Sequence, residues 1–381
     1  MGARAAAKPF STMIVLAVPD FEPSIGGTTT QVALLGRALA RRGLEPLVVT
    51  RRRQRDWPRT ETLDSLPVLR LGPPGRSALG EKATLAPLAG WLGRRRGRIG
   101  VVHSVMWLDS IAAAAAAGLL GRTLLTWGAV GDPTDALRGW RARPRRALLG
   151  RVRSVALTDE MASEIETAGL GTADVVPIAV DRRRFRPPSV AERADARASL
   201  GLGDGDFVVA YVGHLRRLKR VDLLIEAVAR LMRERPEAKL VVVGGSRGAP
   251  DDVEPELRDL VRRGGLTEVV SFHGVLEDPR PAYFAADAVA LASEREGMPN
   301  TLAEAMACGV PCVAPASAGG KALLETVAHS NAPEDLLAEL RRVAATPERE
   351  RLRAAGAERV AQLDPEAIAD RYLAIYLELG L

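Results

Sequence analysis

The sequence predicts an α/β protein of two Rossmann-like domains, each a parallel sheet with helices on both faces. Along the whole chain, short and almost continuously apolar runs alternate with stretches that have the 3.6-residue periodicity of amphipathic helices. Prolines interrupt this alternation once, at residues 181–189, after which it starts again. A length of 381 residues also suits two or three domains of about 150 residues. These observations place one domain on each side of the interruption.

In the first half, apolar runs predict strands at 12–18, 46–50, 67–71, 100–105, 122–126, 152–157 and 172–178, with helices at 28–42 and 108–119. In the second half, strands are predicted at 206–213, 239–245, 269–274, 287–293 and 310–315, with helices at 221–234, 251–263, 299–307 and 332–345. A last helix over 365–379 carries an apolar stripe formed by Ile368, Tyr372, Ile375 and Leu379. We therefore expect a flexible leader over 1–12, a first domain over 13–185, a second domain over 186–364 and a terminal helix over 365–381.

The composition limits the class of protein. The longest apolar run, Ile111–Leu120, has about half of the ~20 residues that a membrane-spanning helix needs. The two cysteines, Cys308 and Cys312, lie in one short segment, which suits a reducing cytosol and provides no metal framework. The four histidines are too far apart in the sequence to suggest a metal site. We expect a cytoplasmic protein, and peripheral attachment to the inner face of the cytoplasmic membrane is a further hypothesis.

Charge is divided unevenly between the halves. Residues 1–185 carry a formal net charge of +12, whereas residues 186–381 carry −6. Arginines gather near tryptophans in three places: Arg51, Arg52, Arg53 and Arg55 with Trp57; Arg94, Arg95, Arg96 and Arg98 with Trp91; and Arg138, Arg141, Arg143, Arg145 and Arg146 with Trp140. Arginine beside tryptophan suits an anionic membrane surface or a lipid-linked or anionic acceptor, and the alternative is a solvated surface. Since no recognised nucleic-acid-binding motif accompanies the arginines, a nucleic-acid partner is not expected.

The most informative segment is SEREGMPNTLAEAMACGVPCVAP, which begins at Ser293. A loop with Glu296 follows a predicted strand, and Pro299 suits the first turn of the next helix. Unpaired backbone amides at this helix start would stabilise a diphosphate, and those amides belong to Gly297, Met298, Asn300 and Thr301. Glu296 can accept hydrogen bonds from sugar hydroxyls. Glu304 lies about two turns along the helix and can accept hydrogen bonds from a vicinal diol, such as that of a ribose. The alternative is an ordinary loop and helix with solvated glutamates.

This segment resembles the Glu-x7-Glu signature of retaining glycosyltransferases of family 4. The resemblance implies the GT-B architecture, in which two Rossmann-like domains face each other across a cleft and the C-terminal helix crosses back to the first domain. It extends to YVGHLRRLKRVDLLIEAV, where family members bind the donor diphosphate through a Gly-Arg-Leu stretch and a later lysine. Gly213 and Lys219 match this pattern, whereas His214 stands where arginine is usual. Arg216 or Arg217 is a candidate for the missing guanidinium, and a solvated helix start is the alternative for the lysine.

Two further segments are similar to the family. The strand and loop that begin at Val269 line the pocket for the nucleotide base in family members. His273 and Val275 are therefore candidate neighbours of the base, with a histidine satisfied within its own loop as the alternative. The glycine-rich loop with Gly26 and Gly27 would let the backbone approach the diphosphate and the acceptor closely.

The sequence departs from the family on the acceptor side. Trp127 stands in place of a histidine that contacts the transferred sugar in many members, and Val105 replaces the second histidine of a frequent His-x-His pair. Asp132, in the loop that follows, is a candidate for presentation to the acceptor. The segment after Pro315 also lacks the apolar strand that is common before the next helix. Because of these departures, a catalytically inactive scaffold or interaction protein of the same fold is an alternative.

The resemblance implies a hexosyl- or glycosyltransferase (EC 2.4) that uses a nucleotide diphosphate sugar and needs no metal. The sugar would pass, with retention of anomeric configuration, to a hydroxyl of a glycan, lipid-linked or small-molecule acceptor in polysaccharide, glycolipid or cell-envelope glycan synthesis. Glu296, Lys219 and Asp132 are the candidate catalytic residues. Such transferases are thought to use a same-face route, in contrast to the two carboxylates of retaining glycosidases. A nucleotide-sugar epimerase of the same fold is a further alternative.

Overall fold

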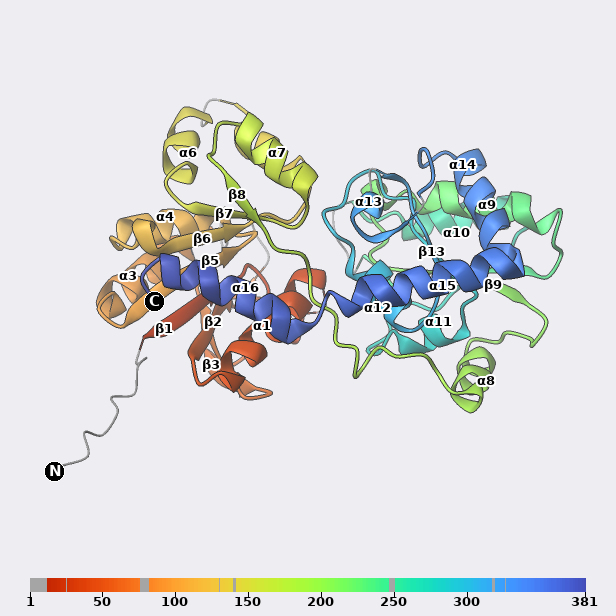
Figure 1. The fold of residues 1–381 in the computed structure, drawn as a ribbon, viewed down its shortest axis with the longest axis horizontal. Coiled ribbons are helices and arrows are strands. Elements are labelled where there is room, and N and C mark those ends of the chain that lie inside the picture. Colours follow the sequence, from red (N-terminus) through yellow and green to blue (C-terminus); the bar gives the residue numbers. More distant parts are fainter. Residues whose placement is uncertain are drawn as a thin grey trace. The chain divides into compact units, whose positions relative to one another are not determined.

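The computed structural model describes residues 12–24, 26–75, 82–129, 131–139, 142–246, 251–316, 319–325 and 327–381, so residues 1–11 of the predicted leader lie outside the described residues. The chain divides into two compact units. The first unit consists of the residues up to Ala179 together with Pro365–Leu381, and the second consists of Val180–Asp364. The division lies at 179/180, where the sequence suggested 185/186. Each unit contains its own sheet with covering helices, as the sequence predicts (Figure 1).

The first unit is built on an eight-stranded sheet with the order β3-β4-β2-β1-β5-β6-β7-β8. Its strands are β1 (Met13–Ala17), β2 (Glu45–Arg51), β3 (Thr60–Leu63), β4 (Leu66–Leu71), β5 (Ile99–Val105), β6 (Thr123–Thr126), β7 (Arg153–Ala156) and β8 (Ala173–Val175). Neighbouring strands pair in parallel except β3 and β4, which form an antiparallel pair at one edge. The sequence does not predict β3, because its polar TETL segment lacks an apolar run.

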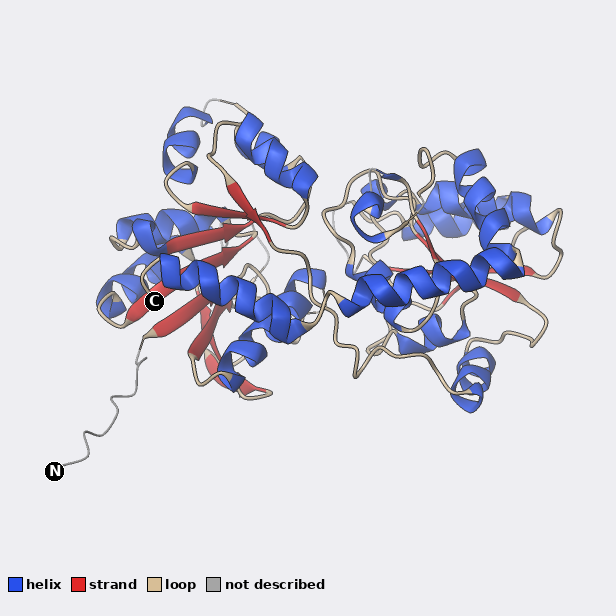
Figure 2. Ribbon diagram, in the orientation of Figure 1, coloured by secondary structure: helices blue, strands red, loops and turns tan. Residues whose placement is uncertain are grey.

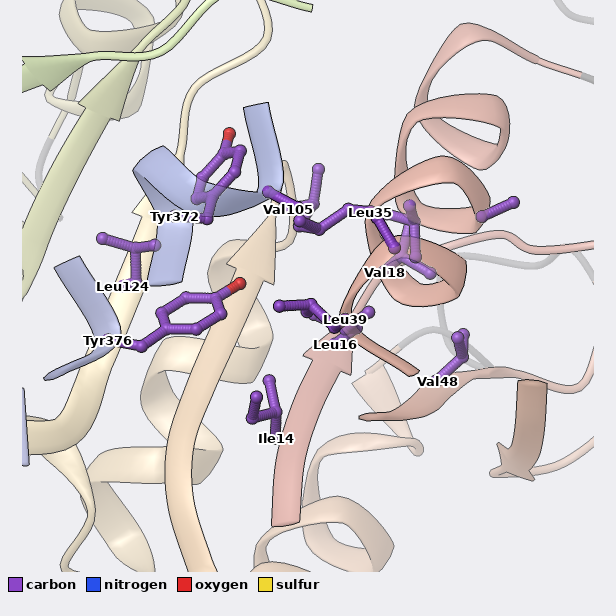
Figure 3. Packing of buried hydrophobic residues seen from close by; sticks show 14 of the residues in the cluster. Ile14, Leu16, Val18, Leu35, Leu39, Val48, Val105, Leu124, Tyr372 and Tyr376 are labelled. Atoms are coloured by element: carbon purple, nitrogen blue, oxygen red, sulfur yellow. The ribbon is translucent and has the colours of Figure 1, made fainter. Parts of the chain in front are cut away.

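Helices cover both faces of this sheet (Figure 2). They are α1 (Gly27–Arg41), α3 (Leu85–Arg95), α4 (Leu108–Ala116), η1 (Leu120–Arg122), α5 (Asp132–Ala136), α6 (Ala142–Leu149), α7 (Asp159–Thr167) and α16 (Pro365–Glu378). Because successive side chains of a strand point to opposite faces, the central strand β1 contributes to two cores. Its residues Ile14 and Leu16 face α1 and α16, as Figure 3 shows, whereas Val15 and Ala17 face α3 and α4.

The C-terminal helix α16 belongs to the first unit, as the sequence predicts, and polar contacts anchor it there. At its start, Arg42, the residue that caps the end of α1, forms ion pairs with Glu366 and, at 2.6 Å, with Asp370. Further along, the hydroxyl of Tyr376 lies 2.7 Å from Nδ1 of His103 on β5. Burial lowers the pKa of His103 to about 3, so its ring is neutral at pH 7. A buried hydrogen bond therefore joins α16 to the central sheet.

The second unit is built on a five-stranded parallel sheet with the order β11-β10-β9-β12-β13. Its strands are β9 (Phe207–Val212), β10 (Ala238–Val243), β11 (Val270–Phe272), β12 (Ala288–Ala290) and β13 (Cys312–Val313). Its helices are α8 (Val190–Ser199), η2 (Arg217–Lys219), α9 (Val221–Met232), α10 (Glu254–Arg263), α11 (Arg280–Ala285), α12 (Asn300–Ala307), α13 (Gly320–Leu323), α14 (Pro333–Ala344) and α15 (Thr346–Ala361).

Several elements of this unit differ from the prediction. The sequence does not predict α8, α11 or α15, and β12 and β13 are shorter than expected. Beyond β13, the described part of the chain adds only an isolated bridge between Pro315 and Ala328 to the sheet. The edge of the sheet is therefore short where the sequence lacks an apolar run.

Two findings about the described residues concern a membrane and a metal ion. No helix among them is both long and apolar enough to cross a bilayer. They also contain no group of three His, Cys, Asp or Glu side chains that could hold a metal ion.

Tyr376→Phe is expected to lower the free energy of unfolding by about 1–3 kcal/mol, because it leaves Nδ1 of the buried His103 without its partner. Urea denaturation measures the change. Leu377→Ala is the matched control. This neighbouring side chain is 50% exposed, and its removal is expected to change the free energy of unfolding by less than about 0.5 kcal/mol. Equal effects of the two substitutions would contradict an anchoring role for the Tyr376 hydroxyl.

Candidate functional site

The second unit brings two predicted site residues, Lys219 and Glu296, together at the carboxyl ends of its strands. Lys219 ends η2 after β9, and Glu296 lies in the loop between β12 and α12. Nζ of Lys219 forms an ion pair with Oε1 of Glu296, and the hydroxyl of Ser293 donates to the same oxygen at 2.8 Å. The two charged side chains, called the lysine–glutamate pair below, are 25% and 16% exposed, so water screens them only in part. This edge of an open α/β sheet is where ligands bind.

The loops that carry the lysine–glutamate pair are tied to each other. The amide of Glu294 donates to the carbonyl of Leu218 at 2.9 Å. Arg220 has a left-handed backbone, with φ of 46°, and its guanidinium forms ion pairs with Asp222 and Glu294. Such a backbone is uncommon for a residue other than glycine and persists where surrounding contacts fix it. These contacts fix the two loops around the pair.

The start of α12 lies beside the same loop. Pro299 occupies the cap position of this helix, where the sequence suggested its first turn. The hydroxyl of Thr301 donates to the carbonyl of Val212 at 3.0 Å, which holds the helix start against the end of β9. Among the described residues, the backbone N–H groups of Gly297, Met298 and Thr301 find no acceptor. Unpaired donors at the N-terminus of a helix are suited to an anionic group.

Close backbone contacts at the ends of β9, β10 and β11 require glycine. Gly244 has a φ of +133°, and a Cβ atom at this position would lie 1.8 Å from the carbonyl oxygen of Gly213. The amide of Gly244 also donates to the carbonyl of Gly274 at 2.7 Å. The predicted residue Gly213 therefore lies where the three strand ends come into contact, and side chains have no room there.

The candidate neighbours of a nucleotide base lie on adjoining loops. His214 is exposed, and its Nδ1 lies 3.4 Å from the carbonyl oxygen of Gly245. Val275 lies beside the same glycine. Nε2 of His273 lies 2.9 Å from the hydroxyl of Ser271, and burial lowers the pKa of its imidazole. His214 and Val275 thus both lie beside Gly245, whereas the partner of His273 is Ser271, on the strand that precedes it.

The two candidate arginines of the same loop differ in their partners. Arg216 forms an ion pair with Asp251, with 3.5 Å between Nε and Oδ1. Arg217 is exposed and forms no ion pair with the described residues. The guanidinium of Arg217 is therefore the one whose charge is not compensated in this part of the chain.

Three predicted site residues belong to the first unit. Gly26 precedes α1, Gly27 is the first residue of that helix, and a Cβ atom at Gly26 would meet no neighbour within 4 Å. Asp132 begins α5, and its Oδ2 accepts a hydrogen bond from the amide of Ala129 at 2.8 Å. The Asp132 carboxylate thus stabilises its own loop, a role that its position in the sequence does not indicate.

Glu304, on α12, is only partly exposed, and one of its carboxylate oxygens has a protein partner. The hydroxyl of Tyr283, on α11, donates to its Oε2 at 2.7 Å, whereas its Oε1 accepts no hydrogen bond from the described residues. Burial raises the pKa of Glu304 to about 7, although the hydrogen bond from Tyr283 acts in the opposite direction. Near pH 7, the carboxyl group is therefore divided between its charged and neutral forms.

Three residues outside the predicted set support the site. Ser293 precedes Glu296 by three residues, a spacing at which a hydroxyl reaches a loop carboxylate. The hydroxyl of Tyr211 donates to the carbonyl of His214 at 2.7 Å, and burial together with the charge of Glu296 raises the pKa of this tyrosine. Tyr283 lies 21 residues before its partner on α12, and no local pattern indicates that contact.

Only part of the predicted arginine–tryptophan surface is exposed. Arg53 forms an ion pair with Asp20, and its side chain is 8% exposed. Nε of Arg51 donates to the carbonyl of Pro19 at 3.0 Å, and Nε of Arg52 donates to that of Trp57 at 2.9 Å. Arg51 and Arg53 thus connect the end of β2 to the loop after β1, whereas Arg52 bonds within its own loop. In this first predicted group these three arginines are bonded to protein, and Arg55 is exposed.

The group at the end of α3 is different. Arg94, Arg95, Arg96 and Arg98 are all exposed, and none of them forms an ion pair with the described residues. The guanidinium of Arg95 lies over the ring of Trp91, 4.9 Å from its centroid. In the third group, Trp140 and Arg141 lie outside the described residues.

Comparisons with known proteins agree with this architecture. Residues 26–181 match the family model described as glycosyl transferase 4-like domain, and residues 206–346 match that described as glycosyl transferases group 1. A D-inositol 3-phosphate glycosyltransferase of Segniliparus rotundus is 35% identical over 75% of this chain and 67% of its own length. One of Jonesia denitrificans is 32% identical over 80% of this chain and 77% of its own length. Other relatives with this name are matched over only 50 to 55% of their length.

Solved structures share the fold. Sucrose-phosphate synthase from Thermosynechococcus elongatus has a TM-score of 0.83 at 23% identity, over 97% of this chain and 99% of that chain. Anabaena HepE in complex with UDP-glucose has a TM-score of 0.76 at 19% identity, over 96% of this chain and 99% of that chain. Likeness at this level of identity concerns the fold alone. Together with the relatives above 30% identity and the two matched models, it shows that the chain belongs to the family 4 glycosyltransferases, which have the GT-B fold.

Proposed function

We propose that the protein transfers a sugar from a nucleoside diphosphate sugar to an acceptor hydroxyl with retention of the anomeric configuration. The observation that carries the proposal is the lysine–glutamate pair beside the N–H groups of α12 that find no acceptor among the described residues. A cation and helix N–H groups at one sheet edge suit a diphosphate. A carboxylate beside them suits the sugar hydroxyls and the positive charge that develops at the anomeric carbon.

In the proposed reaction, the bond between the anomeric carbon and the diphosphate oxygen breaks, and negative charge builds up on the leaving diphosphate. Lys219 and the start of α12 stabilise this charge, while Glu296 stabilises the oxocarbenium-like carbon. The acceptor oxygen then bonds to the same face of that carbon, and its proton passes to the leaving diphosphate oxygen. Asp132, in the first unit, is the candidate for contact with the acceptor.

Comparison supports the class of donor. HepE, a protein of the same fold, has been solved with UDP-glucose, which supports a nucleoside diphosphate sugar as the donor class here. The relatives named D-inositol 3-phosphate glycosyltransferase support a small phosphorylated polyol as one candidate acceptor. Because the first half of the chain is basic, a lipid-linked or other anionic acceptor in envelope glycan synthesis is the second candidate.

A nucleoside diphosphate is expected to raise the melting temperature of the wild-type protein, because a ligand at 100 times its Kd adds about 2.7 kcal/mol of stability. UDP, GDP and ADP are compared by thermal shift. Lys219→Met is expected to abolish most of the shift, because it removes the cation that faces the diphosphate. If none of the three compounds shifts melting, the inactive scaffold becomes the better interpretation.

Glu296→Gln is expected to lower kcat by about 100-fold, because a neutral amide stabilises the positive transition state less well than a carboxylate. The melting temperature is expected to fall only modestly, because the amide oxygen of glutamine can still accept the hydrogen bonds from Lys219 and Ser293. The rate of sugar transfer is measured with the donor that the thermal shift selects. Glu256→Gln, a change of the same kind at an exposed residue of α10, is the control and should retain wild-type activity. Activity near that control would remove Glu296 from the mechanism. Free product formed without any acceptor would instead favour the epimerase alternative.

We further propose that the exposed arginines at the end of α3 bind an anionic membrane surface. These four arginines form no ion pairs with the described residues, so their charges are available to such a surface. Each basic residue near an anionic membrane contributes about 1 kcal/mol to the free energy of binding. The ring of Trp91, beside which the guanidinium of Arg95 lies, is buried in the core, so the arginines supply the proposed contact with the lipid headgroups.

Replacement of these four arginines by glutamine is expected to reduce flotation of the protein with vesicles rich in anionic lipid, since it removes most of the electrostatic attraction. The control carries the same loss of charge at exposed positions of the second unit, namely Arg182, Arg183, Arg262 and Arg263. Flotation at moderate salt is measured for wild type and both variants. Equal loss in both variants, or no flotation of the wild-type protein, would refute a membrane-binding role for α3.

A further inference from the structure

We propose that Tyr283 is a positioning residue, which holds the carboxylate of Glu304 where it binds the ribose hydroxyls of the nucleotide. The inference rests on the proposed function, because it assumes a nucleoside diphosphate at the carboxyl edge of the second sheet. It adds a residue from a separate helix, α11, to the binding site.

The first support is the contact itself. Tyr283 is fully buried, and its hydroxyl donates to Oε2 of Glu304 at 2.7 Å. Its ring packs edge-on against Phe185, with 6.0 Å between centroids and 69° between planes. A carboxylate has about four acceptor positions, so one anchored oxygen leaves room for two further hydroxyl donors. Anchored at Oε2, Glu304 can present Oε1, which has no partner among the described residues, to a vicinal diol.

The second support is the rigidity of the helix that carries Tyr283. Helix α11 has six residues and is too short to be stable by itself. Its last carbonyl groups accept hydrogen bonds from two arginines of α8. Arg193 donates to the carbonyls of Phe284 and Ala286, both at 2.9 Å, and Arg197 donates to that of Ala285 at 3.0 Å. These bonds fix the backbone from which the tyrosine hydroxyl reaches Glu304.

The third support is the charge balance around Glu304. Burial favours its neutral form, and the negative charge of Asp278 acts in the same direction. The hydrogen bond from Tyr283 and the positive charge of Arg184 favour the carboxylate, and the thiol of Cys308 is the other ionisable group nearby. A carboxylate accepts hydrogen bonds from hydroxyls more strongly than a neutral acid does. Loss of the tyrosine hydroxyl would therefore remove both an anchor and a contribution to the charge of Glu304.

The test compares UDP with 2′-deoxy-UDP by calorimetry on the full chain, with GDP and ADP and their deoxy forms in parallel. For wild type, we expect the deoxy compound to bind about tenfold more weakly, because it leaves an acceptor of Glu304 unpaired. For Tyr283→Phe, we expect UDP to bind more weakly and the ratio between the two compounds to fall below about threefold. Tyr376→Phe is the matched control: it removes another buried tyrosine hydroxyl, in the first unit, and should leave the ratio unchanged.

The ratio should also depend on pH. Because burial raises the pKa of Glu304 to about 7, its carboxylate is depleted as the pH falls from 8 to 6, and the ratio falls with it. The hydrogen bond from Tyr283 lowers this pKa, so the midpoint of the change should lie at higher pH in Tyr283→Phe than in wild type. The Tyr376→Phe control should keep the wild-type midpoint.

An unchanged ratio in Tyr283→Phe, or an equal loss of affinity for both compounds, would overturn the inference, because it would show a structural role only. If this variant does not fold, Phe185→Leu loosens the same ring and keeps the hydroxyl. A smaller decrease of the ratio is then expected, and a wild-type ratio overturns the inference. Failure of the proposed function is a different result, namely that wild-type protein binds none of the nucleoside diphosphates.

Discussion

A lysine ammonium that is only partly exposed needs a negative charge beside it, and this requirement organises the carboxyl edge of the second sheet. Glu296 supplies that charge, and the Ser293 hydroxyl stabilises the same carboxylate oxygen. The two loops are 77 residues apart in the sequence, and the contacts of Arg220 hold them together. The lysine–glutamate pair therefore compensates its own charge within the second unit. A diphosphate would give the ammonium a second anionic partner beside the start of α12.

In both units, the hydroxyl of a fully buried tyrosine bonds to an ionisable group. In the first unit, Tyr376 of α16 bonds to His103, which joins the C-terminal helix to the central strands. In the second unit, Tyr283 of α11 bonds to Glu304 of α12. An unsatisfied buried polar group costs about 1–3 kcal/mol, so each bond favours one packing of its helix over others. One bond has a structural consequence, and the other fixes a carboxylate at the candidate site.

The high arginine content of the first half does not produce a uniformly basic surface. Arg70 is buried, forms an ion pair with Glu61 and donates to the carbonyl of Glu22 at 2.5 Å. Its guanidinium also lies 5.2 Å from the ring centroid of Trp57. Arginine is suited to such positions because its planar group donates several hydrogen bonds while its charge stays paired. Part of the positive charge thus supports loops near the sheet, whereas the arginines at the end of α3, and Arg143 and Arg146 of α6, are exposed.

The sequence by itself determined the parallel strands of the two sheets, the placement of Glu296 on a loop and Glu304 on the helix that follows, and the apolar stripe of α16. Each of these depends on local periodicity or spacing. Only the tertiary structure revealed α8 and α15, since these helices bury few apolar residues and leave a weak periodic signal. The bond from Tyr283 to Glu304 and the internal use of Arg53 likewise depend on which segments pack together. Contacts between distant segments are decided by packing and charge compensation in three dimensions, which no local pattern records.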